Sequence, residues 1–281
     1  MNILAVDTCL QPGSLALLRA DASEGLRAEG LAKKGGEPEV VPLPPGWRSV
    51  ALHAEIERLL GRHNLKTADI DVYAVTAGPG AFTGVRLGLT AVKGLAEVHN
   101  KPVLPVSTLE TLAVAAQNSD EWTVTSDENG RRVSESLVTR NDPALAGSFR
   151  SSLVTSYAPV LDARRGQVFA AVYRTEPTEG TELRLVIPEA VCSLRSFLSQ
   201  VDAAGLKDVQ FCLTDESLFL ELQAMEGTVG RSGALVRVSP HLAGSVARIA
   251  VARFRHGQGI TALAAAANYI RASDAELFWK E

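Results

Sequence analysis

The stretch Gly78-Pro79-Gly80-Ala81-Phe82-Thr83-Gly84-Val85-Arg86 joins a predicted strand to a predicted helix. Apolar residues fill positions 70–75 before it, which is typical of a buried strand, and helical spacing follows from Phe82 to His99. A strand, a glycine-rich turn and a helix in this order indicate an α/β fold. Free N–H groups at the start of such a helix often bind anions. The stretch therefore predicts an α/β fold and raises the question of a phosphate site.

The spacing of the glycines excludes the two known nucleotide fingerprints. A Walker loop needs a Lys-Ser/Thr pair that is missing here, and Thr83 stands where a dinucleotide-binding turn has its third glycine. The alternative is a tight turn in which Pro79 and Gly80 only set backbone dihedrals. Both readings stay open at this point.

The helix that follows has two faces that can be covered. Val85, Leu89 and Val92 share one face, and small residues such as Gly84 and Gly88 lie on another. One apolar face is enough for an ordinary surface helix. The second face predicts a partner, either inside the chain or from another subunit.

Two halves of the chain follow a similar plan. Residues 3–6 and 157–161 are apolar strands that end in Asp7 and Asp162, and each turns back into a second strand. This weak internal duplication predicts two lobes with the two carboxylates facing a cleft, where acids can hold a metal–phosphate complex. Alternatively, each is a turn residue that bonds its local backbone.

Changes in composition suggest the domain boundaries. We expect a first lobe at 1–117, a polar insertion at 118–152, a second, smaller lobe at 153–240 and a C-terminal helix and tail at 241–281 that packs back on the first lobe. Within the first lobe, 33–48 reads as a long loop and 51–64 as an amphipathic helix. Ser107 and Glu110 form a predicted capping box for the next helix.

Composition limits the classes of function. The net charge of −4 and 5% aromatic residues disfavour independent binding of nucleic acid. Three distant cysteines and five scattered histidines argue against a disulfide framework and against a metal site. No signal-peptide pattern and no apolar run of about 18 residues occurs, so we expect a cytoplasmic protein without a membrane span.

Four stretches together resemble the bacterial TsaB (YeaZ) family. They are residues 3–8 (Ile-Leu-Ala-Val-Asp-Thr), 78–88 (Gly-Pro-Gly-Ala-Phe-Thr-Gly-Val-Arg-Leu-Gly), 105–110 (Pro-Val-Ser-Thr-Leu-Glu) and 162–169 (Asp-Ala-Arg-Arg-Gly-Gln-Val-Phe). The second and third stretches form a specific pair, and the resemblance covers most of the chain. Departures from the family pattern are Ala81, Cys9 and the acidic stretch 211–216, which would repel phosphate where a relative packs against a nucleotide base.

The resemblance implies a fold and a function. The fold is the ASKHA architecture of actin-like proteins and sugar kinases, an α/β fold with two lobes that each hold a mixed sheet flanked by helices. The implied function is that of a non-catalytic scaffold for TsaD, which transfers a threonylcarbamoyl group to the adenosine next to the anticodon of tRNAs that read A-starting codons. The implied partners are a TsaD-like catalytic subunit, a TsaE-like ATPase and, for the chain alone, a second copy. tRNA would be reached only through the complex.

The resemblance also implies residue roles. The partner surface would lie on the helices at 51–64 and 82–99, with the contacts Ile56, Leu60, Phe82, Val85, Arg86, Leu89, Val92 and Lys93. Asp7, Thr8 and Asp162 would line a vestigial nucleotide cleft, with ATP or ADP held at the boundary with the partner and no cofactor required by the chain itself. No catalytic or metal-binding residue is implied. The alternative function is a stand-alone ASKHA phosphotransferase or a glycoprotease-like hydrolase that uses Asp7 and Asp162 around a divalent cation.

Overall fold

Two five-stranded sheets organise the chain. The structure, a computed structural model, describes residues 1–20, 36–47, 49–118, 154–175, 183–206, 209–225 and 233–271. The predicted insertion at 118–152 lies outside these residues except for Asn118. No helix in the described part of the chain is both long and apolar enough to cross a bilayer.

The two sheets repeat one topology. The first has the order β3-β2-β1-β4-β5, and the second has the order β10-β9-β6-β7-β8, which is the same arrangement read from the other edge. In each sheet the first three strands pair antiparallel and the last two join in parallel. The first sheet consists of β1 (Asn2–Asp7), β2 (Ser14–Arg19), β3 (Glu39–Pro42), β4 (Val72–Thr76) and β5 (Val103–Val106). The second consists of β6 (Ser156–Arg164), β7 (Gln167–Thr175), β8 (Leu183–Cys192), β9 (Val209–Leu213) and β10 (Gly233–Arg237).

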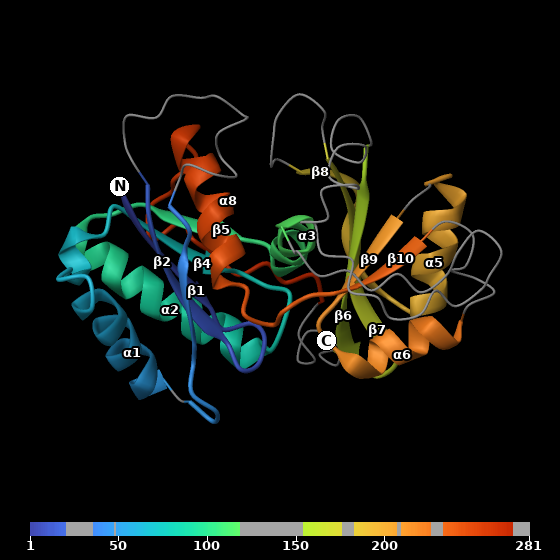
Figure 1. The fold of residues 1–281 in the computed structure, drawn as a ribbon, viewed down its shortest axis with the longest axis horizontal. Helices are drawn as coiled ribbons and strands as arrows, with labels where there is room; N and C mark the ends of the chain where they lie inside the picture. The colour runs from blue at the N-terminus through green and yellow to red at the C-terminus, as the bar shows by residue number, and fades with distance from the viewer. Residues whose placement is uncertain are drawn as a thin grey trace, which may run out of the picture.

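Helices cover both faces of each sheet (Figure 1). The first sheet carries α1 (Ser49–Gly61) and α2 (Phe82–His99) on one face and α8 (Ala243–Arg255) on the other. The second sheet packs against α3 (Thr108–Asn118) on one face and against α5 (Leu194–Ala203) and α6 (Glu216–Ala224) on the other. A short 3-10 helix, η1 (Thr67–Asp69), precedes β4.

The central helical layer ties the two lobes together. α3 lies between the sheets, contacts α8 and packs on β6, β7 and β9, although it follows directly from the last strand of the first sheet (Figure 1). α8 follows the last strand of the second sheet and packs on β1, β2 and β4 of the first. α3, which follows the first sheet in the chain, therefore packs on the second sheet, and α8, which follows the second sheet, packs on the first.

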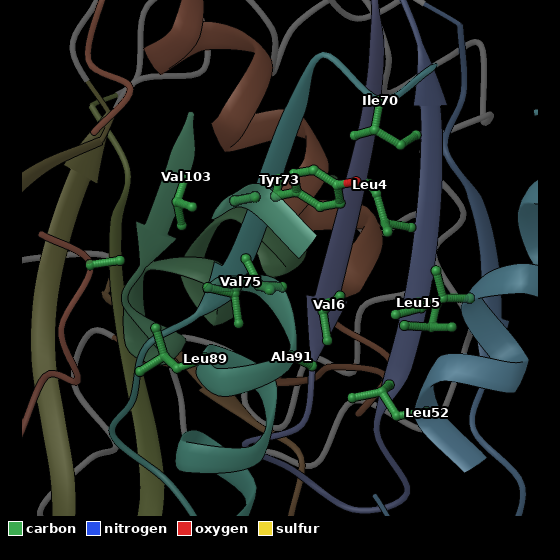
Figure 2. Close-up of a cluster of buried hydrophobic side chains, with 14 of the residues drawn as sticks. Leu4, Val6, Leu15, Leu52, Ile70, Tyr73, Val75, Leu89, Ala91 and Val103 are labelled. Carbon is green, nitrogen blue, oxygen red and sulfur yellow. The ribbon is translucent and has the colours of Figure 1, made fainter. Parts of the chain in front are cut away.

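The strands alternate their side chains between two cores. Leu4, Val6 and Tyr73 face α1 and α2, whereas Ile3 and Ala5 face α8. Because both faces are buried, the strands read as continuous apolar runs in the sequence. Figure 2 shows the first of these cores, in which Leu52 of α1 and Leu89 of α2 meet the sheet.

The structure adds two strands, an α-helix and the short η1 to the elements expected from the sequence. β3 lies inside the segment 33–48 that was predicted to be a loop, and it forms the edge of the first sheet. α6 and β10 complete the second lobe and were not predicted.

Candidate functional site

The turn after β1 places Asp7 in the interior. The Asp7 side chain is 0% exposed, and its Oδ1 accepts hydrogen bonds from Thr76 Oγ1 at 2.8 Å and from the Cys9 amide at 3.1 Å. Its Oδ2 has no hydrogen-bond partner among the described residues. Burial raises the pKa of this carboxyl from 3.8 to about 6, because desolvation outweighs the hydrogen bonds that favour the charged form.

The glycines of α2 close this turn. Thr8 is 0% exposed and donates from Oγ1 to the Gly84 carbonyl at 2.7 Å. A Cβ atom on Gly84 would lie 2.0 Å from the Thr8 carbonyl oxygen, and one on Gly88 would lie 2.3 Å from Thr8 Oγ1. These glycines therefore let the helix touch the turn, which favours the packing role over a phosphate site.

Asp7 and Thr8 consequently do not fit a nucleotide, because neither side chain has an exposed face. Cys9 beside them is 2% exposed, and burial raises the pKa of its thiol to about 12, with the nearby Asp7 charge adding to the effect. A thiol in this environment is a small core residue and not a nucleophile.

Asp162 differs from Asp7 in its surroundings. Its side chain is 38% exposed, its Oδ1 accepts from the Arg164 amide at 2.7 Å, and Arg164 Nη1 lies 3.4 Å from its Oδ2. No hydrogen bond or ion pair in the described ranges joins it to Asp7. Asp7, Thr8 and Asp162 were expected to contact a nucleotide, and of these three only Asp162 has an exposed side chain. Its hydrogen bonds to the local backbone are those of a turn residue.

The expected partner contacts divide into a buried group and an exposed group. Ile56, Leu60, Val85, Leu89 and Val92 are at most 6% exposed and belong to the core between the first sheet and its two helices. These five side chains already pack within the chain, so they are not available as contacts on the predicted partner surface. The exposed remainder of the prediction is Phe82, Arg86 and, in part, Lys93.

An aromatic–arginine cluster occupies the exposed start of α2. The Arg86 guanidinium carbon lies 3.7 Å from the centre of the Phe82 ring, and Arg86 Nε donates to the Tyr269 hydroxyl at 3.0 Å. Phe82 is 48% exposed and Tyr269 is 53% exposed, and their ring centres are 5.8 Å apart. We call these three residues the docking cluster. Sequence reasoning missed Tyr269, whose only signal was an aromatic residue in an alanine-rich tail.

Lys93 holds the C-terminal segment on α2. Its Nζ donates to the Ala265 carbonyl at 2.8 Å and to the Leu263 carbonyl at 3.4 Å. The side chain of Leu263 is 87% exposed. The surface beside α2 is therefore a composite of the helix and the C-terminal segment.

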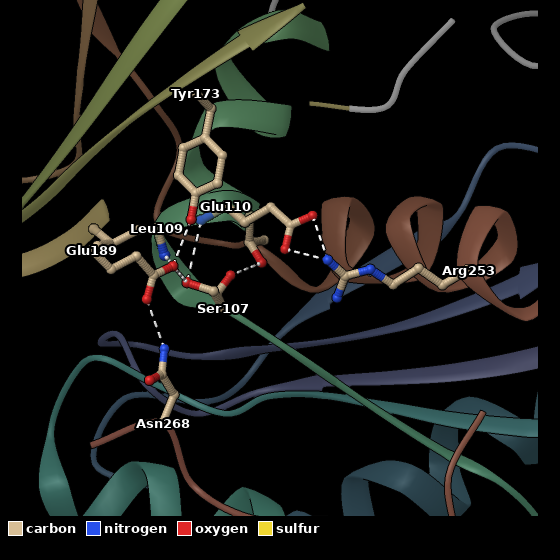
Figure 3. A network of polar contacts seen from close by, with 8 residues as sticks. Ser107, Leu109, Glu110, Tyr173, Glu189, Arg253 and Asn268 are labelled. Carbon is tan, nitrogen blue, oxygen red and sulfur yellow. Dashed lines mark hydrogen bonds and ion pairs between the residues drawn. The ribbon is translucent and has the colours of Figure 1, made fainter. Parts of the chain in front are cut away.

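A polar network crosses the junction between the lobes (Figure 3). Glu189 of β8 accepts hydrogen bonds at Oε1 from Ser107 and, at 2.5 Å, from the Tyr173 hydroxyl. Its Oε2 accepts from Asn268 Nδ2 at 2.7 Å. Burial and the neighbouring Glu189 charge raise the pKa of Tyr173 above its usual range. One carboxylate thus links the first lobe, the second lobe and the C-terminal segment.

The Ser107 half of the predicted capping box is present at the start of α3. Ser107 Oγ accepts from the Leu109 amide at 3.2 Å and the Glu110 amide at 3.5 Å, as a cap does. The Glu110 carboxylate also pairs with Arg253 of α8, whose Nη2 lies 2.7 Å from both oxygens. Glu110 therefore ties the start of α3 to α8, which is far away in sequence.

The acidic stretch 211–216 runs from the end of β9 to the start of α6. Asp215 is the N-cap of α6 and accepts from the amides of Ser217 at 2.8 Å and Leu218 at 3.1 Å. The Ser217 side chain and these amides lower the pKa of Asp215. Among the residues that the structure describes, no group of three or more His, Cys, Asp or Glu side chains is placed to hold a metal ion.

Comparisons with known proteins extend this description. The family model described as TsaD, tRNA N6-adenosine threonylcarbamoyltransferase, matches residues 48–126. The tRNA threonylcarbamoyladenosine biosynthesis protein TsaB of Bacillus subtilis is 26% identical over 281 residues, which cover 100% of this chain and 99% of that protein. TsaB of Escherichia coli is 27% identical over 68% of this chain and 64% of its own length. These matches confirm the resemblance to the TsaB (YeaZ) family.

Solved structures bear out the predicted architecture. YeaZ from Pseudomonas aeruginosa has a TM-score of 0.61 and 24% identity, and the match covers 95% of this chain and 99% of that one. At this identity the likeness speaks for the fold alone. The predicted ASKHA-like α/β fold, with two lobes that each hold a mixed sheet flanked by helices, is confirmed. The TsaD model match spans α1 to α3, which includes the helix that carries most of the docking cluster.

Proposed function

We propose that this chain is a non-catalytic scaffold subunit in threonylcarbamoyladenosine formation on tRNA, and that it supports a TsaD-type catalytic partner. The names of its TsaB relatives support the pathway, and the match of residues 48–126 to the TsaD model supports a likeness between this chain and the proposed partner. The observation that supports the scaffold role most is the closed turn at Asp7 and Thr8. The alternative phosphotransferase or hydrolase would use Asp7 around a divalent cation, and here the side chains of Asp7 and Thr8 are both 0% exposed.

The junction between the lobes supports the same proposal. A phosphotransferase with two lobes needs a cleft that opens for the substrate and closes for the reaction. Glu189 instead joins Ser107, Tyr173 and Asn268, and the crossed helices α3 and α8 bury apolar side chains against opposite sheets. Opening would break this network and expose both helical layers. A fixed body suits a protein that presents a surface.

We place the partner on the docking cluster and the adjoining C-terminal segment. Aromatic and arginine side chains contribute much of the binding energy in protein interfaces, and Phe82, Arg86 and Tyr269 supply them on one exposed face. The proposal gives the chain no cofactor of its own and puts ATP or ADP at the boundary with the partner. It also includes a TsaE-type ATPase as a further member, a homodimer when the catalytic partner is absent, and tRNA contact only through the assembly in the cytoplasm.

The test measures partner binding by calorimetry with a co-produced TsaD-type protein. Phe82→Ala removes an exposed ring from the proposed contact, and we expect affinity to fall at least tenfold. Leu220→Ala is the matched control, because Leu220 is 54% exposed on α6, a helix of the second lobe that is not part of the docking cluster. Equal affinity of the Phe82→Ala variant and the wild type would move the interface away from the docking cluster.

A further inference from the structure

A cavity of about 190 Å³ lies where α3, α8 and the start of β8 meet. Its apolar lining comes from Val114, Leu183, Ile249 and Ala252, and its polar lining from Glu110, Asn118, Arg248, Arg253 and Gln258. It is separate from the docking cluster on α2, and neither the family resemblance nor the proposed function gives it a role.

The two arginines of this cavity have unused hydrogen-bond donors. Arg253 is held by Glu110 through Nη2 alone, so its Nε and Nη1 have no partner among the described residues. Arg248 is partly buried, and none of its nitrogens bonds or pairs with a residue in the described ranges. Arg253 is therefore held in position and Arg248 is partly enclosed, and both have N–H groups available to bind a ligand.

The charge of the lining is positive. Glu110 balances one arginine, so Arg248 leaves one positive charge among the side chains that line the cavity. The planar guanidinium fork matches the paired oxygens of phosphate and carboxylate groups. An anion between the two arginines would satisfy donors that are otherwise unmatched in a partly enclosed site.

The size of the cavity restricts the ligand. A volume of about 190 Å³ lies below the range of about 300–1,000 Å³ for pockets that bury drug-sized ligands and cofactors. The enclosed space therefore suits a group as small as a single phosphate or a carboxylate.

We propose that this cavity is a binding site for a small oxyanion, held by Arg248 together with the free edge of Arg253. Glu110 orients Arg253 and so belongs to the support of the site. Because the site touches α3, α8 and β8, a bound anion stabilises the junction between the lobes. This inference is independent of the scaffold role and stands or falls separately.

The test uses inorganic phosphate as the probe and calorimetric titration of the full chain at constant ionic strength. Wild type should bind phosphate, and Arg248→Gln should weaken that binding at least tenfold because it removes the unpaired charge. Arg255→Gln is the matched control, since it removes the same charge from the same helix outside the cavity. If Arg248→Gln melts early without phosphate, Arg248→Lys serves instead and should bind at an intermediate strength.

The alternatives give distinct results. Phosphate stabilises many proteins through a general salt effect, so a thermal shift shared equally by wild type and Arg248→Gln would overturn the proposal. Heat of binding in the wild type that Arg248→Gln loses and Arg255→Gln keeps would support it. A titration with acetate in place of phosphate tests whether the same site binds a small carboxylate. Binding of adenosine monophosphate without binding of phosphate or acetate would contradict it, because recognition would then rest on the nucleoside.

Discussion

The turn at Asp7 and Thr8 shows how single residues exclude a ligand. Gly84 and Gly88 have no side chain, so α2 reaches the turn and covers the two residues that were expected to line a nucleotide cleft. The glycines were conspicuous in the sequence, but their spacing alone did not reveal what they touch. Their role follows from the contact with Thr8, in the turn after β1 and 76 residues before Gly84.

The close contact at Gly84 makes a direct prediction about stability. Gly84→Ala places a methyl group 2.0 Å from the Thr8 carbonyl oxygen, and backbone would have to move. We expect a loss of about 3 kcal/mol or more in the free energy of unfolding, measured with urea. Gly94→Ala on the same helix is the control, because its Cβ would meet nothing within 4 Å. That variant should gain about 0.5–1 kcal/mol, and equal effects of the two variants would refute the packing argument.

The buried carboxyl of Asp7 predicts a pH dependence. Its pKa is raised from 3.8 to about 6, so between these values the folded chain holds a proton that the unfolded chain has released. The contribution of the protonated Asp7 carboxyl to the free energy of unfolding is full below about pH 4, and it is lost as the pH rises through about 6. The free energy of unfolding of wild type, minus that of Asp7→Asn, should therefore fall by about 3 kcal/mol over this range.

Urea unfolding at a series of pH values measures this difference. Asp202→Asn, which removes an exposed carboxylate from the end of α5, controls for the general loss of one charge. A difference between wild type and Asp7→Asn that is flat from pH 4 to 7 would show that Asp7 ionises normally and is not enclosed.

At the scale of elements, α6 depends on a cap that the sequence could have revealed. Asp215 accepts two amide hydrogen bonds at the start of this helix. Asp215→Ala should lower the free energy of unfolding by about 1 kcal/mol, whereas Asp215→Asn should keep most of the stabilisation by the cap. Thermal unfolding of the two variants provides the comparison, and a full loss in Asp215→Asn would show that charge matters more than the cap.

Elements with strong local patterns were predictable, and those that depend on neighbours were not. The paired strands that carry Asp7 and Asp162 follow from apolar runs and turns in the sequence, although β6 continues past Asp162 to Arg164. β3 was missed because its four residues, within a proline-rich segment, are ordered by pairing with β2. The face of α2 around Val85 was assigned to a partner because an apolar stripe does not say what covers it, and in the structure the first sheet does.

The whole molecule is a duplicated fold whose halves are fastened together. Both sheets have one topology, and α3 and α8 each pack beyond the lobe that precedes them in sequence. Duplication was visible in the sequence as two strands that end in aspartate. The hydrogen bonds that join the two lobes were not visible in the sequence, because Ser107, Glu189 and Asn268 are distant in sequence and meet only after folding.

The measurement that tests the scaffold role most directly is threonylcarbamoyladenosine formation on tRNA, followed by mass spectrometry of the digested tRNA. The reaction would contain threonylcarbamoyl adenylate and tRNA with the purified chain alone, with a TsaD-type partner and TsaE-type ATPase alone, or with all three proteins. We predict no product from the chain alone and a strong increase when it joins the other two. Product formed by the chain alone, and lost in Asp7→Asn, would contradict the account.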